Sequence, residues 1–311
     1  MNIVPQLSRR DWLRAAAAGL AGGALRAADS EPFTIKSGGG EIEVSLSGDF
    51  AVTHASTSAW VSTAARAVTT YFGKFPVPKT LVQVRSGRGR PGVGGGTTYA
   101  EDPPRTVIRM GEGTTAEQLA DDWTMTHELV HLSFPDMPRE HHWIEEGIAT
   151  YVEPISRAQI GTMEPERVWG DMFFQMAQGQ PAANDRGLDF THTWGRTYWG
   201  GALFCLAAEI KIRERTHNRY GLQQALRGIV KAGGSIESDW PIEQALATAD
   251  KAVGVPVLSE LYGEMKDKPA PVDLDRIWKR LGVERAPEGR RVMLRNDAEL
   301  AAVRRAITRR V

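Results

Sequence analysis

One short stretch near the middle of the chain constrains its structure more than any other. It contains the string His-Glu-Leu-Val-His at 127–131 and, fifteen residues after the string ends, the glutamate Glu146. On an α-helix, His127 and His131 lie one turn apart and point the same way. Two neutral imidazoles on one face can bind a zinc ion, with Glu128 on the adjoining side near a metal-bound water. The spacing therefore predicts a zinc site, for which Glu146 is the candidate third ligand.

The alternative is a chance match, because paired histidines on a helix are otherwise usually surface residues or hydrogen-bonded core residues. Apolar side chains lie on or near the helical stripe that carries this pair: Ala116, Leu119, Trp123, Val130 and Phe134. Such a stripe turns the histidines inward. Burying two imidazoles and a carboxylate without partners costs several kcal/mol, and a bound metal removes that cost. The pattern therefore favours the zinc site.

The residues that follow carry a resemblance to a known family. Residues 143–151 read Trp-Ile-Glu-Glu-Gly-Ile-Ala-Thr-Tyr. Together with the first string, they resemble the gluzincin zinc metallopeptidases. Among these, the chain is most similar to the catalytic domain of the glycyl aminopeptidase family and, more distantly, to the alanyl aminopeptidases. Both families carry a Glu-Gly-x-x-x-Tyr continuation, matched here by Glu146, Gly147 and Tyr151, and the resemblance covers about residues 80–235.

The resemblance implies an α+β fold, a thermolysin-like zincin domain in which a small mixed sheet is followed by a mainly helical half. It implies that Zn²⁺ is bound by three side chains, those of His127, His131 and Glu146. Glu128 would be the general base that takes a proton from the attacking water. The families also carry a Tyr-x-x-Gly segment whose tyrosine stabilises an oxyanion. Tyr198 matches that position; the alternative is an aromatic side chain packed at the cleft wall.

One upstream segment departs from the family pattern. In both aminopeptidase families, a glycine-containing strand lines the substrate cleft and continues to a glutamate that binds the free amine of the substrate. Here, residues 93–99 read Val-Gly-Gly-Gly-Thr-Thr-Tyr, and the nearest acid is Glu101. Glycine suits a place where a peptide backbone approaches closely. The missing glutamate leaves the aminopeptidase specificity open.

The predicted function is therefore zinc-dependent hydrolysis of peptide bonds in a peptide or protein substrate, with aminopeptidase activity implied by the resemblance. One alternative is an exported endopeptidase or cell-wall peptide hydrolase with the same chemistry. The other is a non-catalytic binding protein that keeps zinc structurally. The presence of Glu128 and an open fourth zinc position argue against the binding protein, because structural zinc sites usually close with four protein ligands.

The N-terminus resembles a bacterial Tat export signal. Residues 8–14 read Ser-Arg-Arg-Asp-Trp-Leu-Arg, and a short alanine-rich stretch, 15–25, follows. That stretch is too short to span a bilayer as an ordinary helix. We predict a signal peptide over residues 1–28, and a periplasmic or secreted protein without a stable membrane anchor after cleavage. An ordinary alanine-rich helix with an accidental Arg-Arg pair is the alternative.

Charge and cysteine content exclude some classes of function. The formal net charge is zero, so nothing indicates nucleic-acid binding. The single cysteine, Cys205, rules out an internal disulfide. It lies in an apolar run and is expected to be a buried small hydrophobic residue.

We predict a metallopeptidase domain over residues 29–268, with its sheet in 29–112 and its helices in 113–268, and a C-terminal helical extension over 269–311. Periodicity predicts a strand within 31–50 and further strands at 80–84, 106–110 and 291–295. It predicts helices at 58–72, 142–152, 162–178, 194–216, 218–232, 241–253 and 257–266. Residues 273–311 are expected to hold a helix before the strand at 291–295 and a basic amphipathic helix from there to the chain end.

Several finer expectations follow from local rules. Thr114 and Glu117 read as a capping box for the zinc helix, and Pro154 is expected to end the next helix. His141 and His142 are expected at the surface. Four arginines of the last helix are expected to form a solvated face: Arg304, Arg305, Arg309 and Arg310. Thr150, one turn after Glu146, is a candidate for orienting a ligand.

Overall fold

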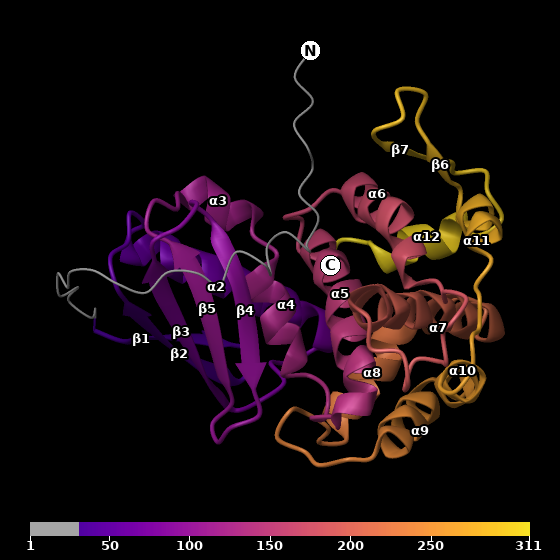
Figure 1. Ribbon diagram of the computed structural model, residues 1–311, viewed down its shortest axis with the longest axis horizontal. Helices are drawn as coiled ribbons and strands as arrows, with labels where there is room; N and C mark the ends of the chain where they lie inside the picture. The colour runs from indigo at the N-terminus through magenta and orange to yellow at the C-terminus, as the bar shows by residue number, and fades with distance from the viewer. Residues whose placement is uncertain (1–30) are drawn as a thin grey trace.

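The computed structural model describes residues 31–311, and the predicted signal peptide, 1–28, lies outside this range. The N-terminal part is a five-stranded sheet with helix α2 packed against it, and the remainder is mainly helical (Figure 1). The predicted α+β architecture, a small mixed sheet followed by a helical half, is confirmed. Among the described helices, none is both long and apolar enough to cross a membrane.

The sheet has the order β1-β2-β3-β5-β4. Its strands are β1 (Phe33–Ser37), β2 (Gly40–Ser47), β3 (Lys79–Gly87), β4 (Val93–Tyr99) and β5 (Arg105–Gly111). The inner strands β2, β3 and β5 run parallel, while the edge strands β1 and β4 are antiparallel to their neighbours. The sheet is therefore mixed, as predicted, and β4 forms the edge that faces the helical half.

The segment 31–50 holds two strands where periodicity indicated one. Gly38 and Gly39 have φ angles of 53° and 88°, and they form the turn between β1 and β2. Positive φ is accessible to glycine at little cost, so the pair permits a tight hairpin. Alternate residues of β2 are buried, as the alternation predicted.

Helix α2 (His54–Phe72) begins four residues before its predicted start. Thr53 and Ser56 form a capping box at its N-terminus, and Gly73, with φ 81°, ends it. The helix packs its buried side chains against β1 and against the helices that carry the site. It therefore supports both halves of the molecule.

The predicted cap of the zinc helix is wrong. Thr115 and Gln118 form a capping box, and the helix they start, α3 (Ala116–Asp121), is separate and short. The hydroxyl of Thr114 instead donates to the carbonyl of Gly111 at 2.6 Å. Helix α4 (Thr124–His131) begins afresh, where the carboxylate of Asp122 accepts from the backbone amides of Thr124 and Met125, each at 3.0 Å.

The next helix, α5 (His142–Gln159), follows the 3₁₀ turn η2 (Arg139–His141) and runs through Pro154, so its predicted end is wrong. A proline removes one backbone hydrogen bond. Here the helix is buried along nearly its whole length, and packing outweighs that loss. Helix α6 (Pro165–Gln175) has its proline in the first turn and is continued by η3 (Met176–Gly179), within the range predicted for one helix.

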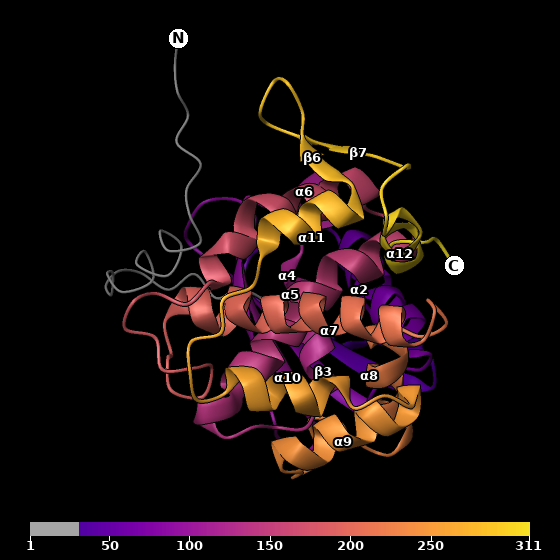
Figure 2. The same ribbon diagram turned by 90° about the vertical axis from the view of Figure 1, so that its right-hand side faces the viewer.

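The remaining helices lie on the side of α5 that faces away from the sheet (Figure 2). They confirm the predicted order: η4 (Gly195–Gly200, a π-helix), α7 (Gly201–Arg215), α8 (Leu222–Lys231), α9 (Ile242–Val253), α10 (Val257–Met265), α11 (Leu274–Leu281) and α12 (Ala301–Ile307). A hairpin of β6 (Val283–Arg285) and β7 (Val292–Leu294) lies between the last two helices. Cys205 is buried in α7, as predicted, and burial raises the pKa of its thiol.

The expectation for Arg304 is wrong. Its side chain is buried, and its guanidinium donates to the carbonyls of Leu281, Gly282 and Arg295. This cation thereby satisfies the carbonyl of Leu281, the last residue of α11, which has no partner within that helix. The other three arginines of the predicted solvated face are exposed, as expected: Arg305, Arg309 and Arg310.

Candidate metal centre

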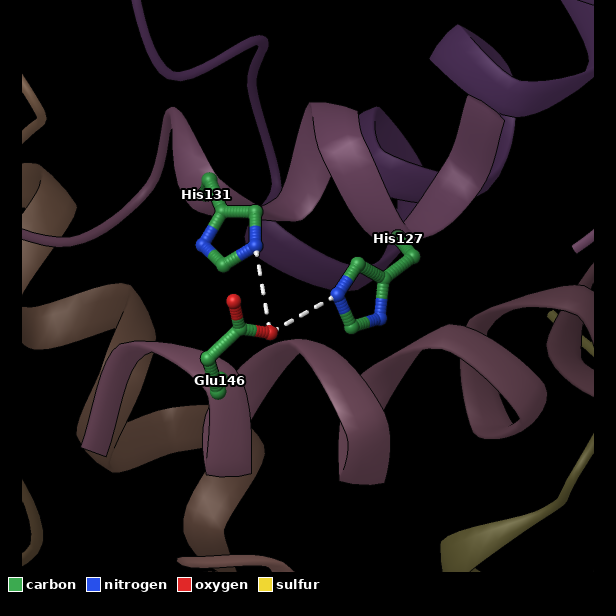
Figure 3. A group of neighbouring side chains, drawn as sticks. All are labelled: His127, His131 and Glu146. Carbon is green, nitrogen blue, oxygen red and sulfur yellow. Dashed lines mark hydrogen bonds and ion pairs between the residues drawn. The ribbon is translucent and has the colours of Figure 1, made fainter. Parts of the chain in front are cut away.

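Three of the predicted site residues converge between α4 and α5. Nε2 of His127 lies 3.1 Å from Oε2 of Glu146, and Nε2 of His131 lies 3.7 Å from the same oxygen. Figure 3 shows both imidazoles of α4 facing the Glu146 carboxylate of α5. One donor atom from each residue lies within 4.8 Å of the other two. The group thus offers two nitrogens and one oxygen around a common point.

Close helix packing places Glu146 at this point. A Cβ on the following residue, Gly147, would lie 2.3 Å from the backbone of Gly201 in α7. No side chain fits there, so α5 and α7 cross at a glycine contact. The glycine that follows Glu146 in the motif thus lets the backbone of α7 pass closely.

The side chains of this group are buried, and burial shifts the pKa values that determine their charge. His127 and Glu146 are 4% and 7% exposed. Burial lowers the pKa of His131 to about 4, so its imidazole is neutral at neutral pH, as a metal ligand requires. Burial opposes the charge of Glu146, but the neighbouring imidazoles, His131 first, hold its pKa well below the ordinary value. Neutral imidazole and ionised carboxylate are the forms that bind cations.

Glu128 is buried beside this group. Burial, with a smaller contribution from the charge of Glu146, raises the pKa of Glu128 to about 7. The hydroxyl of Thr98 in β4 donates to Oε2 of Glu128 at 2.9 Å. A carboxyl group with a pKa near 7 can accept and return a proton at neutral pH.

The glycine-containing strand lies against Glu128. A Cβ on Gly96 would lie 2.5 Å from Cγ of Glu128 and 2.7 Å from Cδ1 of Ile108. Gly96 and Thr98 are two apart and so share one face of β4. Sequence reasoning placed this strand along a substrate cleft and missed Thr98 as a partner of Glu128. The signal available was the alternation itself, which puts the third glycine and the second threonine on one face.

Glu101, the acid that follows this strand most closely in the sequence, is already paired. Arg105 binds both carboxylate oxygens of Glu101, with its Nε at 2.8 Å and a terminal nitrogen at 2.6 Å. The hydrogen bonds that Arg105 donates to Glu101 lower the pKa of Glu101. The pair lies at the exposed end of the sheet, so Glu101 is held by an arginine of its own sheet.

Tyr198 reaches the site from the π-helical turn η4. Its hydroxyl donates to Oε1 of Glu146 at 3.1 Å, and its ring stacks on that of His127 at 6.3 Å. The buried guanidinium of Arg196 in the same turn contacts Asp185 at 2.7 Å, which anchors η4 to the preceding loop. π-Helical turns occur frequently at functional sites.

Of the two histidines before Trp143, His142 is exposed, as predicted, and His141 is not. His142 is half exposed, but its Nδ1 lies 3.1 Å from Glu145 and its Nε2 lies 3.3 Å from Oε1 of Glu146. Its hydrogen bonds to Glu145 and then Glu146 raise the pKa of His142 to about 10. The side chain of His141 is only 15% exposed, so its predicted surface position is wrong.

His141 belongs to a second group, here called the Asp189 cluster. The carboxylate of Asp189 accepts from Nε1 of Trp143 at 2.8 Å and from the hydroxyl of Tyr262 at 2.9 Å, and it contacts Nδ1 of His141 at 3.1 Å. This cluster joins the start of α5 to a loop and to α10. Sequence reasoning missed Asp189 and Tyr262. The hydroxyl of Thr150 makes no hydrogen bond to a described residue, so no contact supports its orienting role.

The sequence matches no protein-family model and no curated protein. Its fold is similar to that of solved M1-type metallopeptidases. One is an aminopeptidase N family protein from Idiomarina loihiensis, with TM-score 0.59 and 14% identity over 81% of this chain and 49% of that one. Another is a variant of an M1 zinc metallopeptidase from Deinococcus radiodurans, with TM-score 0.50 and 16% identity over 78% of this chain and 53% of that one.

At these identities, the likeness shows a shared fold. The chain spans about half the length of these solved structures. The geometry of the side chains at the candidate metal centre is therefore the basis for assigning a function.

Proposed function

We propose that this protein is a zinc-dependent peptidase. The observation that carries the proposal is the convergence of His127, His131 and Glu146 next to the buried carboxyl of Glu128. Two imidazole nitrogens and one carboxylate oxygen are a ligand set of catalytic zinc sites, which leave the fourth position open. The chemistry of the donors therefore fits zinc. The shared fold with solved zinc metallopeptidases supports the same assignment.

The proposed roles follow from position. Zinc in such a site supplies a Lewis acid that polarises a carbonyl and makes water more acidic. Glu128 takes a proton from the attacking water and passes it to the leaving amine. Thr98 holds the carboxylate of Glu128 in place through its hydroxyl. The hydroxyl of Tyr198 donates to Oε1 of Glu146 before the reaction, and its single proton turns to the substrate oxygen as negative charge develops there.

A finer part of the proposal is whether the enzyme removes residues from the N-terminus of its substrate or cuts within the chain. An aminopeptidase of the glycyl or alanyl type, on a thermolysin-like gluzincin domain, agrees with the resemblance in sequence. A specific observation favours the second candidate, an endopeptidase or cell-wall peptide hydrolase. Glu101, the acid that follows the glycine-containing strand most closely in the sequence, is bound by Arg105 at both oxygens. Export to the periplasm or the medium remains a proposal that rests on the N-terminal sequence alone.

The test is mass spectrometry of a mixed peptide pool after incubation with zinc-loaded protein, with Glu128→Gln as the control. We expect cleavage by the wild type and a loss of about a thousandfold in the variant, because a positioned general base contributes about 10²–10⁴-fold. Both proteins should retain zinc. Products shortened only from the N-terminus would establish an aminopeptidase, and internal cuts an endopeptidase. Equal cleavage by both proteins would remove Glu128 from the mechanism.

A further inference from the structure

The two carboxylate oxygens of Glu146 have different surroundings. Oε2 faces the imidazoles of His127 and His131, as the dashed lines in Figure 3 show. Oε1 instead accepts a hydrogen bond from Tyr198 at 3.1 Å and lies 3.3 Å from Nε2 of His142. One oxygen is thus directed at the metal position, and the other is held by the protein.

His142 is itself held by a chain of contacts. Its Nδ1 lies 3.1 Å from Oε2 of Glu145, and the other oxygen of Glu145 accepts from the backbone amide of Met137 at 3.3 Å. The imidazole therefore bridges two carboxylates one residue apart on α5. Ionised carboxylates only accept hydrogen bonds, so each ring nitrogen of His142 acts as a donor. This chain of contacts runs from Met137, in the segment between α4 and η2, to the candidate ligand Glu146.

We propose that His142 is a positioning residue for the metal centre. Held by Glu145, it fixes Oε1 of Glu146, so that the metal is bound through Oε2 alone. This inference rests on the proposed zinc site. Its physical basis is the open fourth position that catalytic zinc requires. A carboxylate that is free to turn can bind through both oxygens and fill that position. Hydrogen bonds to the outer oxygen prevent the turn, as second-layer contacts do at other metal sites.

The experiment compares the Co²⁺-loaded proteins by visible absorption and by the kcat and KM of peptide hydrolysis. The variants are His142→Ala, which removes the donor, and His142→Gln, which keeps an N–H donor without the imidazole. His192→Ala, the loss of an exposed histidine from a loop, is the matched control. Far-ultraviolet circular dichroism and thermal unfolding establish that each variant is folded.

We expect the absorption of Co²⁺ in His142→Ala to weaken and shift, because the coordination number rises when both oxygens bind. We expect kcat to fall about tenfold, within the usual range for a lost second-layer contact, with little change in KM. His142→Gln and His192→Ala should stay close to the wild type. Superimposable spectra for all four proteins, or equal changes in His142→Gln and His142→Ala, would overturn the positioning role.

The same measurements separate this inference from the proposed function. A wild type that binds Co²⁺ and cleaves no peptide would remove the peptidase assignment. The four spectra would still decide whether His142 positions Glu146. A wild type that binds neither Co²⁺ nor zinc would overturn both.

Discussion

The candidate metal centre and the Asp189 cluster are two histidine–carboxylate groups that both include the start of α5, and they differ in their donors. Asp189 receives N–H and O–H groups from Trp143 and Tyr262 and contacts His141, so hydrogen-bonding partners occupy its oxygens. Oε2 of Glu146 instead faces two imidazole nitrogens across a shared point. The carboxylate of Asp189 accepts hydrogen bonds, and that of Glu146 is arranged to bind a metal cation together with the two imidazoles.

This difference separates a structural group from a chemical one. A buried carboxylate that already accepts several hydrogen bonds gains little from a metal and stabilises the fold. A buried carboxylate next to neutral imidazoles gains a great deal. Burial lowers the pKa of His131 to about 4, which keeps its ring neutral and available to a metal. A histidine near an acid is therefore a weak sign of a metal site, and the convergence of lone pairs is a strong one.

The largest expected effect comes from removing the candidate ligand. Glu146→Ala should reduce bound zinc from about one per chain to a small fraction and lower turnover about a thousandfold, because metal catalysis supplies several kcal/mol. Metal content after dialysis and peptide hydrolysis measure the two effects. Glu145→Ala, one residue earlier, is the control and should retain its zinc. Loss of zinc from Glu145→Ala alone would show that the ligand is misassigned by one position.

The complementary change in the Asp189 cluster should act on stability. Asp189→Ala leaves Trp143, Tyr262 and His141 without their acceptor and should cost about 3 kcal/mol of unfolding free energy. Zinc content and turnover per folded molecule should stay near wild-type values. Chemical denaturation followed by tryptophan fluorescence gives the first quantity. Asp189→Asn, which keeps one acceptor oxygen, should cost less. A variant of Asp189 that is stable and has lost its zinc would break the comparison.

The grouping of His127, His131 and Glu146 was predictable from sequence because its signals are local. His127 and His131 lie one turn apart on any helix, and Glu146 follows on the next helix. The Asp189 cluster was not, since Tyr262 and Asp189 lie far from His141 in the sequence and meet only through the packing of α10. Packing of α4 against β4 also places Gly96 against Glu128, and no local pattern indicates that contact.

Other misses arose where two local interpretations competed. Thr114 with Glu117 and Thr115 with Gln118 both read as capping boxes one residue apart, and the hydrogen bond of Thr114 to Gly111 decided between them. The rule for Pro154 failed because α5 is buried through its whole second half. In the first case one local contact replaced another, and in the second tertiary packing outweighed a local preference.

A smaller effect should come from the strand beside Glu128. Gly96→Ala would push a methyl group into Cγ of Glu128, so the general base should move. We expect turnover to fall about tenfold to a hundredfold with zinc retained, since misplacing a catalytic group by about 1 Å costs about 10². Gly94→Ala is the control, because a Cβ there meets its nearest atom, the carbonyl of Arg109, at 3.7 Å. Equal turnover in both variants would show that β4 does not position the base.

The smallest effect should come from His141, the histidine of the Asp189 cluster. His141→Ala removes one contact of 3.1 Å to Asp189 and leaves the hydrogen bonds from Trp143 and Tyr262 in place. Because a hydrogen bond to a charged group contributes about 1.5–3 kcal/mol, we expect a loss near the lower end, well below that of Asp189→Ala. Denaturation curves of His141→Ala and Asp189→Ala, recorded with and without zinc, give the difference in their unfolding free energies.

Zinc should raise the unfolding free energy of both variants by the same amount, since the ligand adds RT ln(1 + [L]/Kd) wherever Kd is unchanged. A smaller gain from zinc in His141→Ala would mean that this histidine contributes to the metal centre, and the two clusters would then have to be treated as one.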